Sequence, residues 1–233
     1  ENYQTEVSEK EQKKIISDIE EKIETSGKED LSQRIGLSNE DIEILHITKT
    51  GLEIGGMPVD SLIGYKGRDV KLNYYASFAP KTYVEALRKL ASDLKLNVIG
   101  IVAQPFAVAR AYSGSSSRDF SAMFVDIGGG TTDIAVVDQG SVVETKMFAF
   151  GGRTFTKEIV RSGNIEYRIA EQRKLKYSKR ELTRELSRDV QKTVYPVAKL
   201  WMKTLKSAIS YCDDIDSFPA QIYLCGGGSL LPE

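Results

Sequence analysis

The feature that most constrains this chain is the stretch FVDIGGGTT at residues 124–132, a strand pattern that runs directly into three consecutive glycines. Glycine has no Cβ, so three in a row allow backbone N–H groups to turn inward and approach an anion closely. Thr131 and Thr132 add hydroxyl donors, and Asp126 and Asp133 lie where a hydrated Mg²⁺ could be held. The pattern predicts a phosphate-binding loop, with a nucleoside triphosphate as the leading ligand.

The residues after the three glycines distinguish this loop from an ordinary flexible turn. A second strand is predicted at residues 134–138, a turn at Gln139 and Gly140, and a third strand at residues 141–148. The loop therefore joins paired strands, unlike the strand-to-helix phosphate loops of Walker or Rossmann type.

A second glycine segment repeats this arrangement near the end of the chain. Residues 220–225 read as a short apolar strand and lead into Gly226, Gly227 and Gly228. Between the two loops, Glu171 and Lys174 are three residues apart and share a helix face. Taken alone, they are predicted to form a solvated surface ion pair worth about 0.3 kcal/mol.

In this order the motifs resemble those of the actin-like ATPase superfamily, and most of all FtsA, the bacterial cell-division actin homologue. The likeness rests on VDIGGGTTDIAV (125–136), FGGRTFTKEI (150–159), AEQRK (170–174) and LCGGGSLLP (224–232). Four motifs in the family's order are more specific than any one. The resemblance implies an α/β fold: a partial actin-like, ribonuclease H-like half-domain with a mixed sheet, and a small α+β strand-helix-strand subdomain.

The resemblance also assigns roles to residues and implies ATP and Mg²⁺ as ligands. Asp126 would orient Mg²⁺ through water, while Gly151 and Gly152 would support the cleft from below. The β- and γ-phosphates would lie on Gly128, Gly129, Gly130, Thr131 and Thr132, and the ribose and adenine on Glu171, Lys174, Gly226, Gly227 and Gly228.

Gln104, before Pro105, occupies a position where many relatives carry glutamate. An amide can position the attacking water but cannot accept its proton, so the resemblance implies at most slow ATP hydrolysis. The alternative is that Gln104 is only the polar residue before a helix-starting proline.

Two regions of the chain are expected from these patterns. Residues 1–103 are interpreted as a small interaction subdomain of the FtsA and PilM type, with an N-terminal amphipathic helix, strands at 42–54 and 70–79, a helix at 82–96 and a strand at 97–103. Residues 104–233 are interpreted as the half-domain with the connecting helix and both glycine loops. A long helical pattern at 179–212 is interrupted by Pro196, which predicts two helices or one kinked helix, with Trp201 in the core.

Composition excludes several classes of function. The net charge is −1, and neither the two cysteines nor the one histidine, His46, has the spacing of a zinc site or supports a histidine-based triad. The sequence has no run of about 18 apolar residues and no signal peptide. A basic region at 153–206 lacks any recognised nucleic-acid module, so no nucleic-acid partner is expected.

Taken with the family's properties, the resemblance predicts an ATP-binding protein of bacterial cell division. Such proteins form filaments and tether the tubulin-like division protein and other divisome components to the inner face of the cell membrane at the septum, from the cytoplasm. The chain starts without Met and stops just after the second glycine loop, which suggests a segment of a longer protein. The first phosphate loop and a C-terminal membrane-binding helix are expected outside it.

The sequence leaves two alternatives open. A PilM-like, ATP-binding scaffold for type IV pilus assembly would share the small subdomain. A small-molecule kinase or chaperone-type ATPase would need a substrate pocket with a catalytic carboxylate, or a linked peptide-binding domain.

Overall fold

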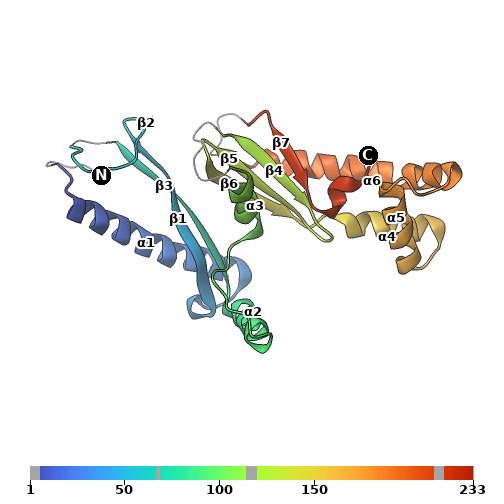
Figure 1. Ribbon diagram of the computed structural model, residues 1–233, viewed down its shortest axis with the longest axis horizontal. Helices are drawn as coiled ribbons and strands as arrows, with labels where there is room; N and C mark the ends of the chain where they lie inside the picture. The colour runs from blue at the N-terminus through green and yellow to red at the C-terminus, as the bar shows by residue number, and fades with distance from the viewer. Residues whose placement is uncertain (1–5, 67–68, 114–119, 213–217, 233) are drawn as a thin grey trace. The chain divides into compact units, whose positions relative to one another are not determined.

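The computed structural model describes residues 6–66, 69–113, 120–212 and 218–232. The chain divides into two compact units, Glu1–Gln104 and Pro105–Glu233 (Figure 1). Each unit has its own sheet.

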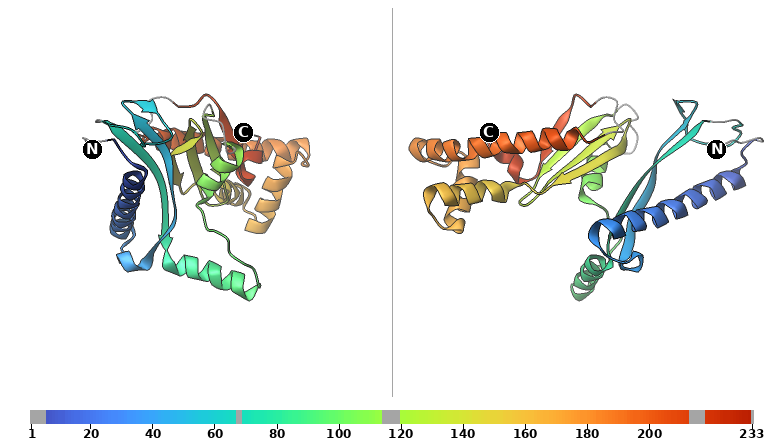
Figure 2. Two further views of the ribbon diagram at one scale, coloured as in Figure 1. Left: turned by 60° about the vertical axis from the view of Figure 1, so that its left-hand side comes forward. Right: turned by 180° about the vertical axis from the view of Figure 1, so that it is seen from behind.

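The first unit is built on a long antiparallel strand pair. β1 (Ile42–Ile54) pairs with β3 (Val70–Pro80), and the short β2 (Met57–Pro58) extends β1 on its other edge. α1 (Glu9–Ile35) runs along one face of this pair, as both panels of Figure 2 show. Its start is fixed by a capping box, in which Ser8 and Glu11 exchange backbone and side-chain hydrogen bonds, and its end by Gly36 in the left-handed conformation.

The remaining part of this unit follows the sequence prediction only in part. The 3₁₀ turn η1 (Asn39–Asp41) leads into β1, and α2 (Lys81–Asp93) follows β3 directly. Residues 97–103, predicted as a strand, form none in the structure, and Ile99 is 97% exposed. β-Branched residues such as those at 98, 99, 101 and 102 favour an extended backbone, but a strand also needs a neighbouring edge with which to pair.

The boundary between the units falls after the first residue of α3 (Gln104–Ser113), and the second unit contains a four-stranded mixed sheet in the order β6-β5-β4-β7. β4 (Ala122–Ile127), β5 (Thr132–Asp138) and β6 (Ser141–Phe148) are antiparallel neighbours, whereas β7 (Ile222–Cys225) pairs with β4 in parallel. This mixed sheet agrees with the α/β half-domain expected from the sequence.

α6 (Arg184–Ile209) packs against this sheet, and α4 (Gly152–Gly163) and α5 (Tyr167–Ser178) pack on α6 and on each other. All three helices contribute to one core with β4 and β5, which includes Val125 and Ile134, both 0% exposed. The opposite face carries Phe124, which stacks on Tyr223 at a ring-centroid distance of 5.2 Å and contacts Tyr112 of α3. Because both faces are covered, β4 is apolar almost throughout.

Three local predictions can be compared directly with this unit. Gln139 and Gly140 both have positive φ, which identifies the two-residue primed turn that suits a right-twisted hairpin. Pro196 lies inside one helix, α6, so the two-helix alternative is wrong. Trp201 is 8% exposed and belongs to the core, as predicted.

β7 forms one edge of the sheet, and it is short. Ile222 and Leu224 are 55% and 57% exposed. The 3₁₀ turn η2 (Gly227–Leu230) follows β7 at once and packs against the end of β4.

Candidate functional site

The glycine loop between β4 and β5 is held in shape by the start of α4. The N–H of Gly128 donates to the carbonyl of Thr131 at 2.9 Å and closes the loop. The N–H groups of Gly152 and Arg153 donate to the carbonyls of Gly128 and Gly129, at 2.8 and 2.7 Å. The first turn of α4 therefore binds two successive carbonyls of the loop.

This arrangement fixes the direction of the amides. In a trans peptide the N–H points opposite to the C=O of the same plane, and no described peptide bond is cis. Since the carbonyls of Gly128 and Gly129 point toward α4, the N–H groups of Gly129 and Gly130 point away from it. Both glycines are exposed. Two successive amides directed to one side form an anion-binding concavity.

The glycines beneath and beside the loop are required by close packing. A Cβ on Gly151 would lie 2.5 Å from the carbonyl oxygen of Gly128, so the backbone at residue 151 must be bare. Gly226 has φ +77°, and a Cβ there would collide with Asp126. Gly228 is pressed against Ile127 in the same way. The second glycine segment therefore lies directly against the end of β4.

A pocket of about 140 Å³ opens between these segments. Its lining brings together seven of the residues predicted from the sequence: Gly128, Gly129, Gly152, Glu171, Lys174, Gly227 and Gly228. Leu175, Ser178 and Leu231 complete it. Whole small-molecule sites usually measure about 300–1,000 Å³, so this pocket could hold only part of a nucleotide.

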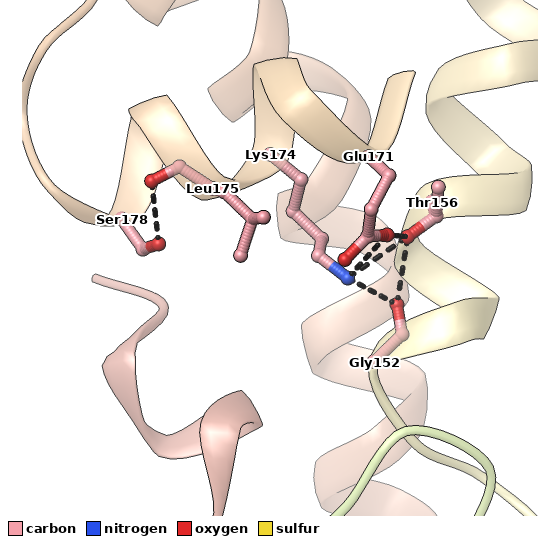
Figure 3. Close-up of polar contacts among 6 residues, drawn as sticks. All are labelled: Gly152, Thr156, Glu171, Lys174, Leu175 and Ser178. Carbon is pink, nitrogen blue, oxygen red and sulfur yellow. Dashed lines mark hydrogen bonds and ion pairs between the residues drawn. The ribbon is translucent and has the colours of Figure 1, made fainter. Parts of the chain in front are cut away.

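Lys174 and Glu171 form the polar wall of this pocket (Figure 3). Lys174 is 8% exposed, and its ammonium donates to the carbonyl of Gly152 at 3.0 Å, to Oγ1 of Thr156 at 2.9 Å and to Oε2 of Glu171 at 2.9 Å. An ammonium has three protons, and all three are used. The prediction of a solvated surface pair is therefore wrong. A Cβ built on Gly152 would lie 3.4 Å from Nζ, an ordinary van der Waals contact, so the ammonium packs closely on this backbone.

Glu171 is the charged partner that balances Lys174. Burial raises the pKa of this carboxyl, but hydrogen bonds from Thr156 and Lys174 and the positive charges of Lys174 and Arg153 outweigh it, so its pKa lies below the ordinary value. The Thr156 hydroxyl also approaches the carbonyl of Gly152. Sequence reasoning missed Thr156, although it lies one helical turn after Gly152 on the same face.

The two threonines of the loop differ from their predicted role as phosphate donors. Thr131 donates its hydroxyl to Oδ2 of Asp133 at 3.1 Å. Thr132 is 0% exposed, and its Oγ1 donates to the carbonyl of Phe150 at 2.6 Å and accepts a hydrogen bond from Nε1 of Trp201 at 2.9 Å. The Thr132 hydroxyl thus faces the core, which corrects its assignment as a side-chain donor to phosphate.

Neither Asp126 nor Gln104 lines this pocket, and their proposed roles remain predictions. Asp126 is half-buried at the end of β4, opposite Cys225 of β7. Burial, and then the charge of Asp126, raises the pKa of the Cys225 thiol. Gln104 is the first residue of α3. Among the described residues, no three His, Cys, Asp or Glu side chains gather closely enough to hold a metal ion.

Comparisons with known proteins agree with this geometry. Residues 123–232 match the family model described as cell division protein FtsA. This segment is FtsA-like. The FtsA-like segment contains both glycine loops, α4, α5 and α6, and so the whole of the pocket.

Individual relatives extend the comparison. The chain is 30% identical over 115 residues to cell division protein FtsA of Neisseria meningitidis serogroup B, which covers 49% of the chain and 28% of that protein. It is 26% identical over 172 residues to FtsA of Enterococcus faecalis, covering 66% of the chain and 39% of that protein. The chain thus spans well under half the length of these relatives.

Solved structures show the same fold. A PilM-PilN type IV pilus biogenesis complex matches 93% of this chain and 57% of its own chain, with a TM-score of 0.67 and 19% identity. The ethanolamine utilization protein EutJ from Carboxydothermus hydrogenoformans matches 64% of this chain and 50% of its own, with a TM-score of 0.51 and 28% identity. The predicted resemblance to FtsA within the actin-like ATPase fold is therefore confirmed.

Proposed function

We propose that this chain supplies one side of an ATP-binding cleft in an FtsA-like protein of bacterial cell division. The observation that supports it best is the pair of amides at Gly129 and Gly130, turned outward because α4 holds the carbonyls of Gly128 and Gly129. Amides fixed before a ligand arrives lose no ordering entropy when they bind a phosphate.

A carboxylate at the entrance of the loop suits Mg²⁺. This ion keeps several waters and is usually bound through one or two carboxylates together with substrate phosphates. Asp126, at the end of the strand that enters the loop, could supply such a carboxylate through water. The metal would then arrive together with the nucleotide.

The wider role comes from the family and is part of the same proposal. The protein would polymerise with ATP bound and hold the tubulin-like division protein and other divisome proteins at the inner face of the membrane at the septum. The described residues include no helix long and apolar enough to cross a bilayer. Membrane attachment through a helix outside this chain would serve the tethering role.

The identity of residue 104 as glutamine bears on the rate of ATP hydrolysis. We infer that Gln104 positions water without accepting its proton, so that ATP is bound for long periods and hydrolysed slowly. A measurement of phosphate release with excess Mg-ATP checks this, and a rapid steady-state rate would contradict it.

Isothermal calorimetry with Mg-ATP tests the binding proposal. Asp126→Asn should weaken binding by roughly tenfold or more, because a neutral amide is a poor partner for hydrated Mg²⁺. Asp138→Asn is the matched control, because Asp138 lies at the end of β5 that is far from the glycine loop. Its carboxylate accepts a hydrogen bond from Ser121 at 2.7 Å. Equal traces for the wild type and Asp126→Asn would refute the site.

A scaffold for pilus assembly is the alternative. It is favoured by the extent of the PilM-PilN match, which covers 93% of the chain and so includes the first unit. At 19% identity, however, that match shows the fold alone, while the sequence relatives are cell-division proteins. Binding of the tail peptide of the division tubulin supports cell division. Binding of an N-terminal peptide from a pilus partner supports the alternative.

A further inference from the structure

Arg153 is bound to the glycine loop through its own backbone. It is the second residue of α4, and its N–H donates to the carbonyl of Gly129 at 2.7 Å. The neighbouring N–H of Gly152 is committed to Gly128 in the same way. An anion on the outer side of the loop therefore cannot reach these two helix amides directly, and only a side chain from this turn could extend to it.

The side chain of Arg153 lies along the tip of the loop. A methyl group built on Gly129 would be 3.7 Å from Nε of Arg153, and one built on Gly130 would be 3.9 Å from Nη1. These are van der Waals distances. The guanidinium is therefore beside the two glycines whose amides point outward, and Arg153 is exposed.

Within the described ranges, the guanidinium of Arg153 takes part in none of the ion pairs. Burial raises the pKa of the Glu171 carboxyl, whereas the positive charge of Arg153 helps to lower it. Arg153 is thus a cation at the rim of the pocket. Its planar fork of N–H donors matches the geometry of phosphate oxygens.

We propose that Arg153 binds the terminal phosphate of the nucleotide on this loop and makes the site prefer a nucleoside triphosphate to a diphosphate. The inference rests on the proposed function. The outward amides of Gly129 and Gly130 bind one phosphate, and the guanidinium beside them adds charge-assisted hydrogen bonds to the outermost group. A diphosphate lacks that group and gains little from Arg153.

Calorimetric titration of the full-length protein, in which both sides of the cleft are present, with Mg-ATP and with Mg-ADP tests this. Arg153→Ala should weaken Mg-ATP binding by roughly tenfold and Mg-ADP binding by no more than about twofold, because charge-assisted hydrogen bonds to the terminal phosphate are lost only with the triphosphate. Arg153→Lys should fall between, since a point charge replaces a planar fork. Lys157→Ala, an exposed cation one turn further along α4, is the matched control and should leave both affinities unchanged.

The possible results distinguish a failure of the proposed ATP binding from a failure of the proposed role of Arg153. If the wild type gives no heat with either nucleotide, the proposed function fails. If the wild type binds but Arg153→Ala keeps the wild-type ratio of affinities, only the role of Arg153 is overturned. An equal loss for both nucleotides also overturns it, because the cation would then serve the shared phosphates. Unchanged emission from Trp201 shows that the variant is folded.

Discussion

Replacing Thr132 with valine removes one oxygen atom from the interior of the second unit while preserving shape. That oxygen donates to the carbonyl of Phe150 and accepts from Nε1 of Trp201, and the residue is 0% exposed. In Thr132→Val the indole N–H loses its partner in the core and the carbonyl loses a donor. Leaving a buried polar group without a partner costs about 1–3 kcal/mol, so the two together should lower the free energy of unfolding by roughly 2–4 kcal/mol.

Urea unfolding followed by tryptophan fluorescence measures this loss. Trp201 is the single tryptophan of the chain and lies in the second unit, so its emission reports that unit alone. Thr131→Val is the control, because Thr131 is only half-buried and its hydroxyl bonds locally to Asp133. It should cost less than about 1 kcal/mol. A Thr132→Val effect below about 0.5 kcal/mol would show that the buried hydroxyl does not support the loop.

A double-mutant cycle assigns the loss to the Trp201 contact. Trp201→Phe removes the N–H donor and keeps an aromatic ring, and its unfolding is followed by far-UV circular dichroism. If the hydrogen bond is real, the two substitutions combined should cost about 1 kcal/mol less than their sum. Strict additivity would mean that the two side chains do not interact.

Two further predictions concern the polar wall of the pocket. Since the folded pKa of Glu171 lies below its ordinary value of 4.5, its stabilising contribution is complete above that value and is lost as the pH falls through the folded pKa. The difference in stability between the wild type and Glu171→Gln should therefore shrink below about pH 4.5 in acid titrations, and a difference that stays constant through that range would contradict the prediction. Lys174→Met should lower the free energy of unfolding by roughly 2 kcal/mol, because Thr156, Glu171 and the Gly152 carbonyl lose a shared donor. Adding Glu171→Gln should recover part of that loss in denaturant melts, and no recovery would argue against the pairing.

The sequence predicts the β4–loop–β5–turn–β6 unit well because its determinants are local. Short runs of apolar residues, three glycines and the Gln139-Gly140 turn each act within a few residues. The inward direction of the Thr132 hydroxyl could also have been predicted from the sequence. Side chains alternate along a strand, so Thr132 shares a face with Ile134 and Val136, and both belong to the core.

Other features depend on residues that are distant along the chain. The burial of Lys174 depends on the carbonyl of Gly152, which accepts from its ammonium and is 22 residues earlier, and helix spacing alone cannot reveal this contact. The failure of residues 97–103 to form a strand has a similar cause, because pairing depends on a partner edge and not on the segment itself. Arg153 belongs to the motif at 150–159, but the sequence does not show that its side chain lies beside the glycine loop, because that position depends on the contact between α4 and the loop.

The exposed border of β7 has a practical consequence for handling the protein. Among the described strands β7 pairs only with β4, and Ile222 and Leu224 are exposed, so its other edge offers a template on which another molecule can add its own strand. Concentrated samples will tend to associate through this edge, and a lysine introduced there would oppose that association without changing the glycine loops.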